Sequence, residues 1–170
     1  MLSIVVFAGG CGKKVAVAPV PPSAESRHAY SRAIERSPGH YRAYLGLAYS
    51  ADENTDVEPL YRKVVEIAPN FLEGRLALGS YYGAIDDFER ASEQYFAALA
   101  VNPKYDVAEF RLGLLMEEAE RNEEAEKHFT RVIELNPASY EAFYHLGNLY
   151  IAATTLMKPS GVTSRCSAFV

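Results

Sequence analysis

The chain has 170 residues, and 49% of them are hydrophobic, so it is long enough and apolar enough for one packed domain. Its formal net charge of −5 argues against a nucleic-acid surface, because such a surface depends on clustered Lys and Arg. Beyond the N-terminal segment, no apolar run reaches the length of about 18 residues that a membrane-spanning helix requires.

The first 14 residues combine a short apolar run, Leu2–Ala8, with two glycines and then Cys11. This arrangement resembles the end of a bacterial lipoprotein signal peptide, although no Lys or Arg precedes the apolar run. The resemblance implies that Cys11 is lipidated and becomes the first residue of the mature protein, and that Gly12 directs the protein to the outer membrane. The alternative is a cytoplasmic chain whose apolar N-terminus is disordered or packs on the first helix.

Residues 15–23 form a segment of proline and small apolar residues, VAVAPVPPS. This composition favours an extended polyproline conformation, with about 3.1 Å per residue. We therefore expect a linker that would hold the following domain roughly 25–30 Å from a membrane surface. Such a linker is consistent with an anchor at Cys11.

From residue 24 onward, the sequence repeats. The first sign is a series of prolines separated by 31, 34 and 34 residues, namely Pro38, Pro69, Pro103 and Pro137. Small and apolar residues recur between the prolines with a helical spacing, and the central copy carries Leu78, Gly79, Tyr82, Ala91, Tyr95 and Ala98. Each proline is expected to stop a helix, because proline lacks the amide donor and disfavours helical geometry in the residue before it.

This pattern resembles the tetratricopeptide repeat, a helix–turn–helix unit of 34 residues. The resemblance implies an all-α solenoid of about eight helices that forms a right-handed superhelix over residues 24–153. About three full repeats would be flanked by a half repeat at each end. Residues 154–170 would form an irregular tail, because Pro159 and Gly161 fall where the next helix should lie.

The predicted helices begin with residues 24–37 and continue with about 40–51. In the next helix, Asp56 is the expected N-cap and Pro59 lies in the first turn, where proline is tolerated. Small residues are expected wherever the two helices of a repeat approach closely, because one repeat cannot bury its own apolar face. These small residues are Gly79, Ala91, Gly113, Ala125 and Gly147.

The charged residues suggest no catalytic, cofactor-binding or metal-binding site. The acidic run Glu117–Glu126 is interleaved with Arg121 and is expected to be a solvated surface, with Glu123 and Lys127 as an i,i+4 pair. The four histidines lie apart in the sequence, so surface or packing roles are expected for His28, His40, His128 and His145.

In the tetratricopeptide family, the second, fifth, ninth and twelfth positions of each repeat line an inner groove that binds a protein or peptide partner. The corresponding residues here are Arg42, Leu45, Tyr49, Asp52, Glu73, Leu76, Ser80, Gly83, Phe110, Leu114, Glu117, Tyr144 and Asn148. The fifth position is apolar or aromatic in all four copies, which predicts an exposed apolar stripe along the groove. Chaperone-binding members of the family hold a terminal carboxylate with a set of Lys and Asn residues. In this chain, only Asn148 corresponds to a member of that set.

The sequence therefore predicts a non-catalytic scaffold that binds an apolar helix or peptide flanked by Asp52, Glu73 and Glu117. It also predicts a protein that is anchored through Cys11 in the bacterial envelope, on the periplasmic side of the outer membrane, with no other membrane contact. The alternative is a cytoplasmic adaptor or a fragment of a larger regulatory protein. An enzyme would need a set of catalytic residues, and no such set is apparent.

Overall fold

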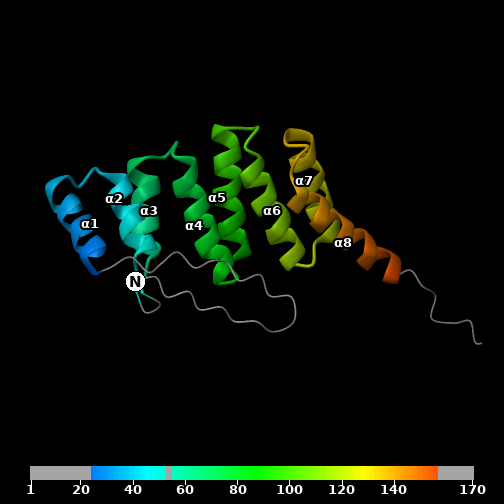
Figure 1. Ribbon diagram of the computed structural model, residues 1–170, viewed down its shortest axis with the longest axis horizontal. Helices are drawn as coiled ribbons and strands as arrows, with labels where there is room; N and C mark the ends of the chain where they lie inside the picture. Colours follow the sequence, from blue (N-terminus) through cyan, green and yellow to red (C-terminus); the bar gives the residue numbers. More distant parts are fainter. Residues whose placement is uncertain (1–23, 53–54, 157–170) are drawn as a thin grey trace, which may run out of the picture.

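The computed structural model of the protein describes residues 24–52 and 55–156. Every regular element in this part is an α-helix, which confirms the predicted all-α class (Figure 1). The helices are α1 (Ala24–Arg36), α2 (Tyr41–Tyr49), α3 (Glu58–Ile67), α4 (Leu72–Ala84), α5 (Phe88–Val101), α6 (Asp106–Glu118), α7 (Asn122–Leu135) and α8 (Tyr140–Leu156). The predicted signal segment 1–14 with Cys11, the linker 15–23 and the tail from residue 157 lie outside the described residues.

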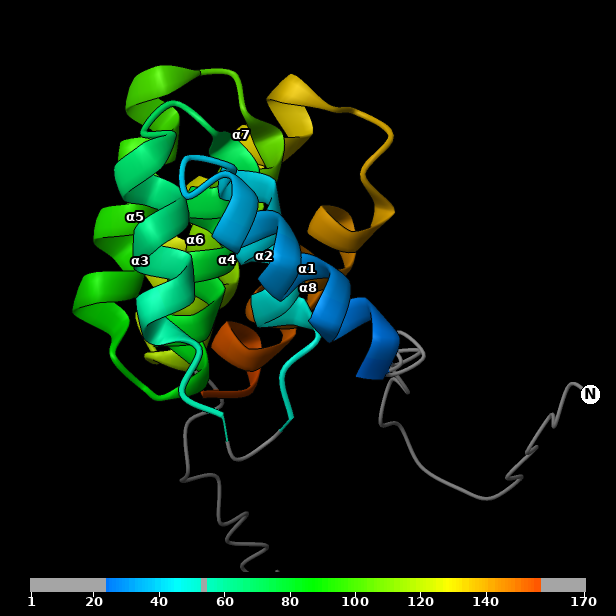
Figure 2. The same ribbon diagram turned by 90° about the vertical axis from the view of Figure 1, so that its left-hand side faces the viewer.

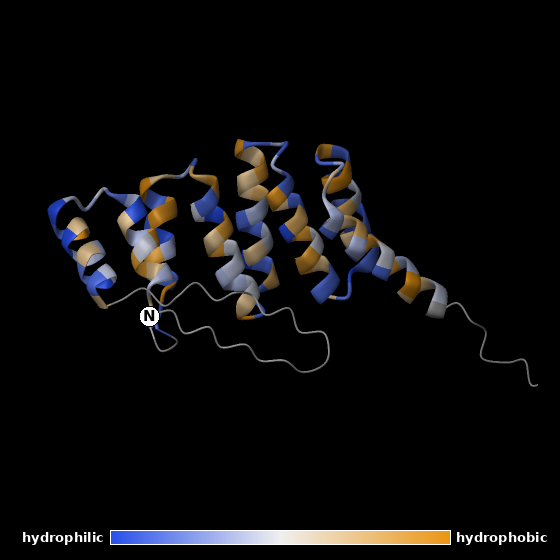
Figure 3. Ribbon diagram, viewed as in Figure 1, coloured by the Kyte–Doolittle hydropathy of each residue, from blue (hydrophilic) through white to orange (hydrophobic). Residues whose placement is uncertain are grey.

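The helices follow one another in chain order along an elongated stack (Figure 1). The most extensive contacts join α4 to α5 and α6 to α7, the two helices of one repeat in each case, and α4 also touches α6. Viewed along the stack, α3 and α5 lie on one side and α2 and α4 toward the other (Figure 2). The C-terminal half of α8 projects beyond the rest of the stack and still carries hydrophobic residues (Figure 3).

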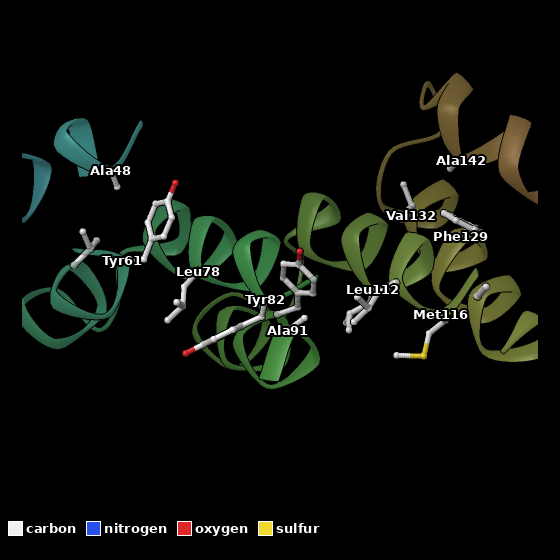
Figure 4. Packing of buried hydrophobic residues seen from close by; sticks show 14 of the residues in the cluster. Ala48, Tyr61, Leu78, Tyr82, Ala91, Leu112, Met116, Phe129, Val132 and Ala142 are labelled. Carbon is white, nitrogen blue, oxygen red and sulfur yellow. The ribbon is translucent and has the colours of Figure 1, made fainter. Parts of the chain in front are cut away.

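The core is one continuous row of apolar side chains that runs through the stacked repeats (Figure 4). Each repeat contributes equivalent residues to it. Leu78 and Leu112 of the first helices are 3% and 0% exposed, and Tyr95 and Phe129 of the second helices are 3% and 0% exposed. This arrangement follows from the repeat itself, since each helix pair has an apolar face that neighbouring pairs cover.

Glycines set how closely the helices of a pair approach. A Cβ atom at Gly79 would lie 2.6 Å from the ring of Tyr95, and one at Gly113 would lie 2.6 Å from the ring of Phe129. The prediction of close contact is therefore confirmed at both positions. At Gly147, a Cβ atom would meet nothing within 4 Å among the described residues, because no described helix packs on this side of α8, so the prediction at this position stays a prediction.

The turns after α4 and α6 have the same geometry. Asp86 and Glu120 have φ values of 59° and 58°, in the left-handed region. The next amides, those of Asp87 and Arg121, donate back to the carbonyl oxygens of Tyr82 and Met116 at 2.9 and 2.8 Å, as in a Schellman motif. The shared turn fixes the angle at which α5 and α7 return along their partners.

Helix boundaries deviate from the predictions by a few residues. The helix expected at about 40–51 spans Tyr41–Tyr49, and α8 continues to Leu156, past the predicted solenoid end at 153. The N-cap of α3 is Val57, whereas Asp56 lies one residue earlier and its Oδ1 accepts the amide of Glu58 at 3.1 Å. Pro59 lies in the first turn of α3, as predicted.

Alanine substitutions at Gly113 and Gly147 should have opposite effects on stability. A methyl group at 113 would press on the fully buried ring of Phe129, and overpacking of this kind costs about 1–3 kcal/mol. A methyl group at 147 meets no neighbour, while alanine favours a helix over glycine by roughly 1 kcal/mol. Urea unfolding followed by circular dichroism should show a lower midpoint for Gly113→Ala and a higher one for Gly147→Ala. Equal losses in both variants would contradict the open environment of Gly147.

Candidate functional site

Four of the predicted groove residues line one depression near the middle of the stack. Tyr49 of α2 and Glu73, Leu76 and Ser80 of α4 border a hollow of about 430 Å³. The remaining lining residues are Val57, Tyr61, Ala77, Tyr81 and Arg111. The first helices of three successive repeats therefore contribute to a single concave surface.

A second depression of about 300 Å³ continues the first along α4 and α6. Ser80 and Arg111 border both hollows, and the predicted residues Gly83 and Leu114 line the second one. Together the residues that line these two hollows are called the central groove. The structure thus brings together six of the predicted residues, from Tyr49 at one end to Leu114 at the other.

Aromatic rings form the wall of the central groove near α2 and α3. Tyr49 is 51% exposed, and its ring meets that of Tyr61 edge to face at 6.2 Å. The Tyr61 ring in turn lies 6.1 Å from that of Tyr81. Burial raises the pKa of the Tyr49 phenol, and the nearby carboxylate of Glu73 raises that pKa further. The wall is therefore an apolar surface with a negative charge beside it.

Arg111 gives the groove a positive charge that the sequence-based prediction missed. It lies on α6 directly after Phe110, at the sixth position of its repeat, whereas only the second, fifth, ninth and twelfth positions were expected to face the groove. The hydroxyls of Ser80 and Tyr95 are 3.2 Å apart in the same region. Burial raises the pKa of the Tyr95 phenol, and the hydrogen bond to Ser80 and the charge of Arg111 work against that rise.

The expected apolar stripe at the fifth positions does not form as predicted. Leu45 is 6% exposed and belongs to the core, so its side chain is not available to a ligand. Leu76 and Phe110 are partly buried and pack against that core, and the Phe110 ring lies 5.7 Å from Phe129. Tyr144 is exposed, at 60%. In most repeats, the side chain at the fifth position packs against the core. The exposed aromatic ring of the central groove is therefore that of Tyr49, at the ninth position.

Other predicted groove residues lie near the two ends of the stack, outside the central groove, and two of them pair with another helix. The carboxylate of Asp52 lies 3.3 Å from the guanidinium of Arg27 on α1, and Arg42 lies over the ring of Tyr41. At the other end, Glu117 of α6 lies 2.6 Å from Nδ1 of His145 on α8. Asn148 lies on α8, one turn beyond Tyr144. Of the three predicted acidic residues, Glu73 is the one that lines the central groove.

Two histidines form pairs that sequence reasoning did not find. His128 of α7 contacts Glu109 of α6 at 2.8 Å, and the His145 ring stacks on Phe129 at 5.1 Å besides its contact with Glu117. The paired residues are 19 and 28 positions apart in the chain, so no local spacing could reveal them. These pairs hold α6 to both following helices.

Within residues 24–52 and 55–156, no group of three or more His, Cys, Asp or Glu side chains is placed to hold a metal ion. In the acidic run, Arg121 forms two hydrogen bonds with Glu124 at 2.8 and 2.6 Å, and Glu126 accepts the hydroxyl of Tyr150 at 2.7 Å. None of the described helices is long and apolar enough to cross a membrane.

The repeat geometry agrees with comparisons to known proteins. A family model described as tetratricopeptide repeat matches residues 23–69 and 110–155, which together make up more than half of the chain. The chain belongs to the tetratricopeptide repeat family. Proteins of this family mediate protein–protein interactions, and their fold is generally a non-catalytic scaffold.

Individual relatives share only parts of their sequence with this tetratricopeptide protein. The peroxisomal targeting signal receptor of Candida glabrata is 36% identical over 72 residues, which are 42% of this chain and 12% of that receptor. The crystal structure of MamA superposes with a TM-score of 0.67 at 22% identity, covering 75% of this chain and 77% of that one. The first tetratricopeptide domain of Spaghetti (RPAP3), bound to an HSP90 peptide, superposes with a TM-score of 0.54 at 21% identity, covering 80% and 99%. At these identities, the structural likeness shows the fold alone.

Replacing Glu73 by glutamine should lower the pKa of the Tyr49 phenol, because the carboxylate charge disfavours the phenolate. The folded-state pKa lies above the ordinary 10.0, so the neutral phenol contributes stability that is present below pH 10 and is lost as the pH rises through the folded-state pKa. NMR titration of ¹³C-labelled tyrosine rings measures the shift. Glu66→Gln on the outer helix α3 is the control and should leave this pKa unchanged. An unchanged Tyr49 pKa in Glu73→Gln would show that the Glu73 carboxylate does not act on the Tyr49 phenol.

Proposed function

We propose that this tetratricopeptide protein is a non-catalytic scaffold that binds a helix or extended segment of a partner protein in the central groove. The observation that carries the proposal is the joining of the two hollows at Ser80 and Arg111, with the exposed ring of Tyr49 at one end. A concave surface with an exposed aromatic ring and a few polar groups is the usual form of a peptide-binding site.

The lining residues define the chemistry of the partner. Tyr49, Leu76 and Leu114 offer apolar contact along the groove, so the partner needs at least one apolar or aromatic anchor. The groove also holds one positive charge, Arg111, and three carboxylates, those of Glu73, Asp86 and Glu118. Complementary charges on the partner would fix its orientation and register. The partner is therefore expected to carry more basic than acidic residues around its apolar anchor.

The relatives support a peptide or protein ligand. One similar protein is a receptor for a peroxisomal targeting signal, and one similar structure holds an HSP90 peptide. The chain covers 12% of the receptor's length, so the receptor's own cargo is not carried over to this protein. What the relatives share with this chain is a repeat surface on which a short segment can bind.

For cellular location, we propose that Cys11 is lipidated and holds the solenoid at the bacterial envelope, where it would contribute to the assembly of envelope complexes. The support is the apolar run before Cys11 and the proline-rich linker 15–23 that follows it. The second candidate is a cytoplasmic adaptor or part of a larger regulator. The observation that favours this candidate is that the chain matches only a small share of the length of its relatives.

The groove is tested with peptides selected from a random displayed library on the full-length protein. Replacing Tyr49 by alanine removes the exposed aromatic anchor, and the loss of such an anchor costs about 2 kcal/mol, or about 30-fold in Kd. Fluorescence anisotropy with the selected peptides measures this loss.

The matched control is Phe96→Ala on α5. Phe96 is also 51% exposed, but it is not among the residues that line the two hollows. Its substitution should leave the affinity unchanged. Selected peptides that bind Tyr49→Ala as tightly as the unmodified protein, or that lose affinity only in Phe96→Ala, would place the binding site outside the central groove.

The anchor is tested by replacing Cys11 with serine in bacteria supplied with labelled fatty acid. Serine lacks the thiol that carries the lipid, so both label and membrane association should be lost. Fractionation of the two strains provides the measurement. A soluble, unlabelled unmodified protein would exclude the lipoprotein and leave the cytoplasmic adaptor.

A further inference from the structure

In the helix pairs α4–α5 and α6–α7, one set of contacts repeats. The ring at the middle of the second helix packs on the glycine of the first helix, Tyr95 on Gly79 and Phe129 on Gly113. Three residues after the glycine, a large side chain is covered by the pair, and Tyr82 is 4% exposed. A first helix whose second helix is in place therefore has a ring against its glycine and a covered side chain three residues later.

Helix α8 carries the same first-helix residues without that cover. Gly147 is equivalent to Gly79 and Gly113, but a Cβ atom there would meet nothing within 4 Å in the part of the chain that the structure describes. Tyr150 is equivalent to Tyr82, yet it is 50% exposed although its hydroxyl still bonds Glu126, as Tyr82 bonds Glu58. Phe143, on the same side of the helix, is 53% exposed. The contact to the preceding repeat is thus complete, and the contact within the pair is not.

Helix α1 shows the reverse situation at the other end of the stack. Its residues Ser26, Tyr30 and Ala33 have the spacing of the second-helix residues Ala91, Tyr95 and Ala98 and of Ala125, Phe129 and Val132. Those six are between 0% and 3% exposed, whereas no residue of α1 is buried. The Tyr30 ring packs on Gly46 of the next repeat, just as Phe129 stacks on His145. Helix α1 is therefore a second helix without a first helix in the described part of the chain.

We propose that the open side of α8 receives α1 of a second copy of this chain, so that a helix pair forms between two molecules. The ring of Tyr30 would then pack on Gly147 as Phe129 packs on Gly113. Ala29 corresponds to His128 and Phe143 corresponds to Glu109, and His128 and Glu109 are in contact in the α6–α7 pair. Ala29 would therefore lie opposite Phe143, so that a small side chain meets a large one. The two joined surfaces differ, so the association is head-to-tail and extends beyond a dimer.

The segment that follows α8 in the sequence fits this site less well than α1. Counted from the repeat, the residues that would hold the positions of Ala125, Phe129 and Val132 are Pro159, Thr163 and Cys166. None of them is aromatic, and a proline inside a helix removes a backbone hydrogen bond. Helix α1, by contrast, has an aromatic residue at the central position and small residues on either side of it.

The test is sedimentation of the full-length chain over a concentration series from about 1 μM to about 1 mM. The average mass should rise above the 18.8 kDa of one chain as concentration increases. Gly147→Leu and Ala29→Arg should each abolish this rise, because each blocks one of the two joined surfaces. Both substitutions lie at open or exposed positions, so circular dichroism should show an intact fold.

Mixing the two variants makes the test specific for head-to-tail association. The Ala29→Arg chain keeps a functional α8, and the Gly147→Leu chain keeps a functional α1, so the mixture should form pairs at twice 18.8 kDa and nothing larger. Ala100→Leu, at an exposed position of α5, is the control and should associate like the unmodified protein. A chain that stays at single mass throughout the series would overturn the proposal. So would association that is lost in Gly147→Leu and kept in Ala29→Arg, because α8 would then be covered by something other than α1.

Discussion

The contact on which the whole structure depends is an aromatic ring packed on a glycine inside a helix pair. In two of the three helix pairs, α4–α5 and α6–α7, the ring leaves no space for a Cβ atom, at 2.6 Å from the position that such an atom would take. A ring and a bare backbone fit closely because neither has flexible atoms, and close packing is what distinguishes a protein interior from a liquid. The distance between the helices of these two pairs, and hence the width of the two central repeats, follows from this contact.

The same rings also connect one repeat to the next. Phe129 touches Gly113 within its pair and stacks on His145 of the following repeat, and Tyr30 packs on Gly46 in the same way. A polar contact follows the same period: Tyr82 bonds Glu58, and Tyr150 bonds Glu126, 24 residues apart in each case. Because each repeat is bonded only to its neighbours, the two ends of the described stack keep the contacts that face inward and show no outward contact with another described helix.

The central groove is a result of this stacking. Where α2, α4 and α6 lie side by side, their exposed positions meet at the Tyr49 ring, at Ser80 and at Arg111. Residues that point into the stack, such as Leu45, are used by the core instead. The surface left for a ligand is therefore set by which side chains the neighbouring repeat has already covered. It joins an apolar wall to Arg111 and to the carboxylates of Glu73, Asp86 and Glu118.

The sequence by itself determined the helix–turn–helix period, the all-α class and the contacts at Gly79 and Gly113, because small, large and proline residues recur at fixed spacing and these properties are local. Only the tertiary structure decided which of the repeated positions reach the surface. Leu45 and Tyr144 occupy the same position of their repeats, yet one is 6% and the other 60% exposed, since Leu45 packs within the core whereas α8 ends the described stack. The pairs of His128 with Glu109 and of His145 with Glu117, and the place of Arg111 in the groove, likewise depend on how helices stack. Burial and long-range pairing are properties of neighbouring repeats, and the spacing within one repeat does not contain them.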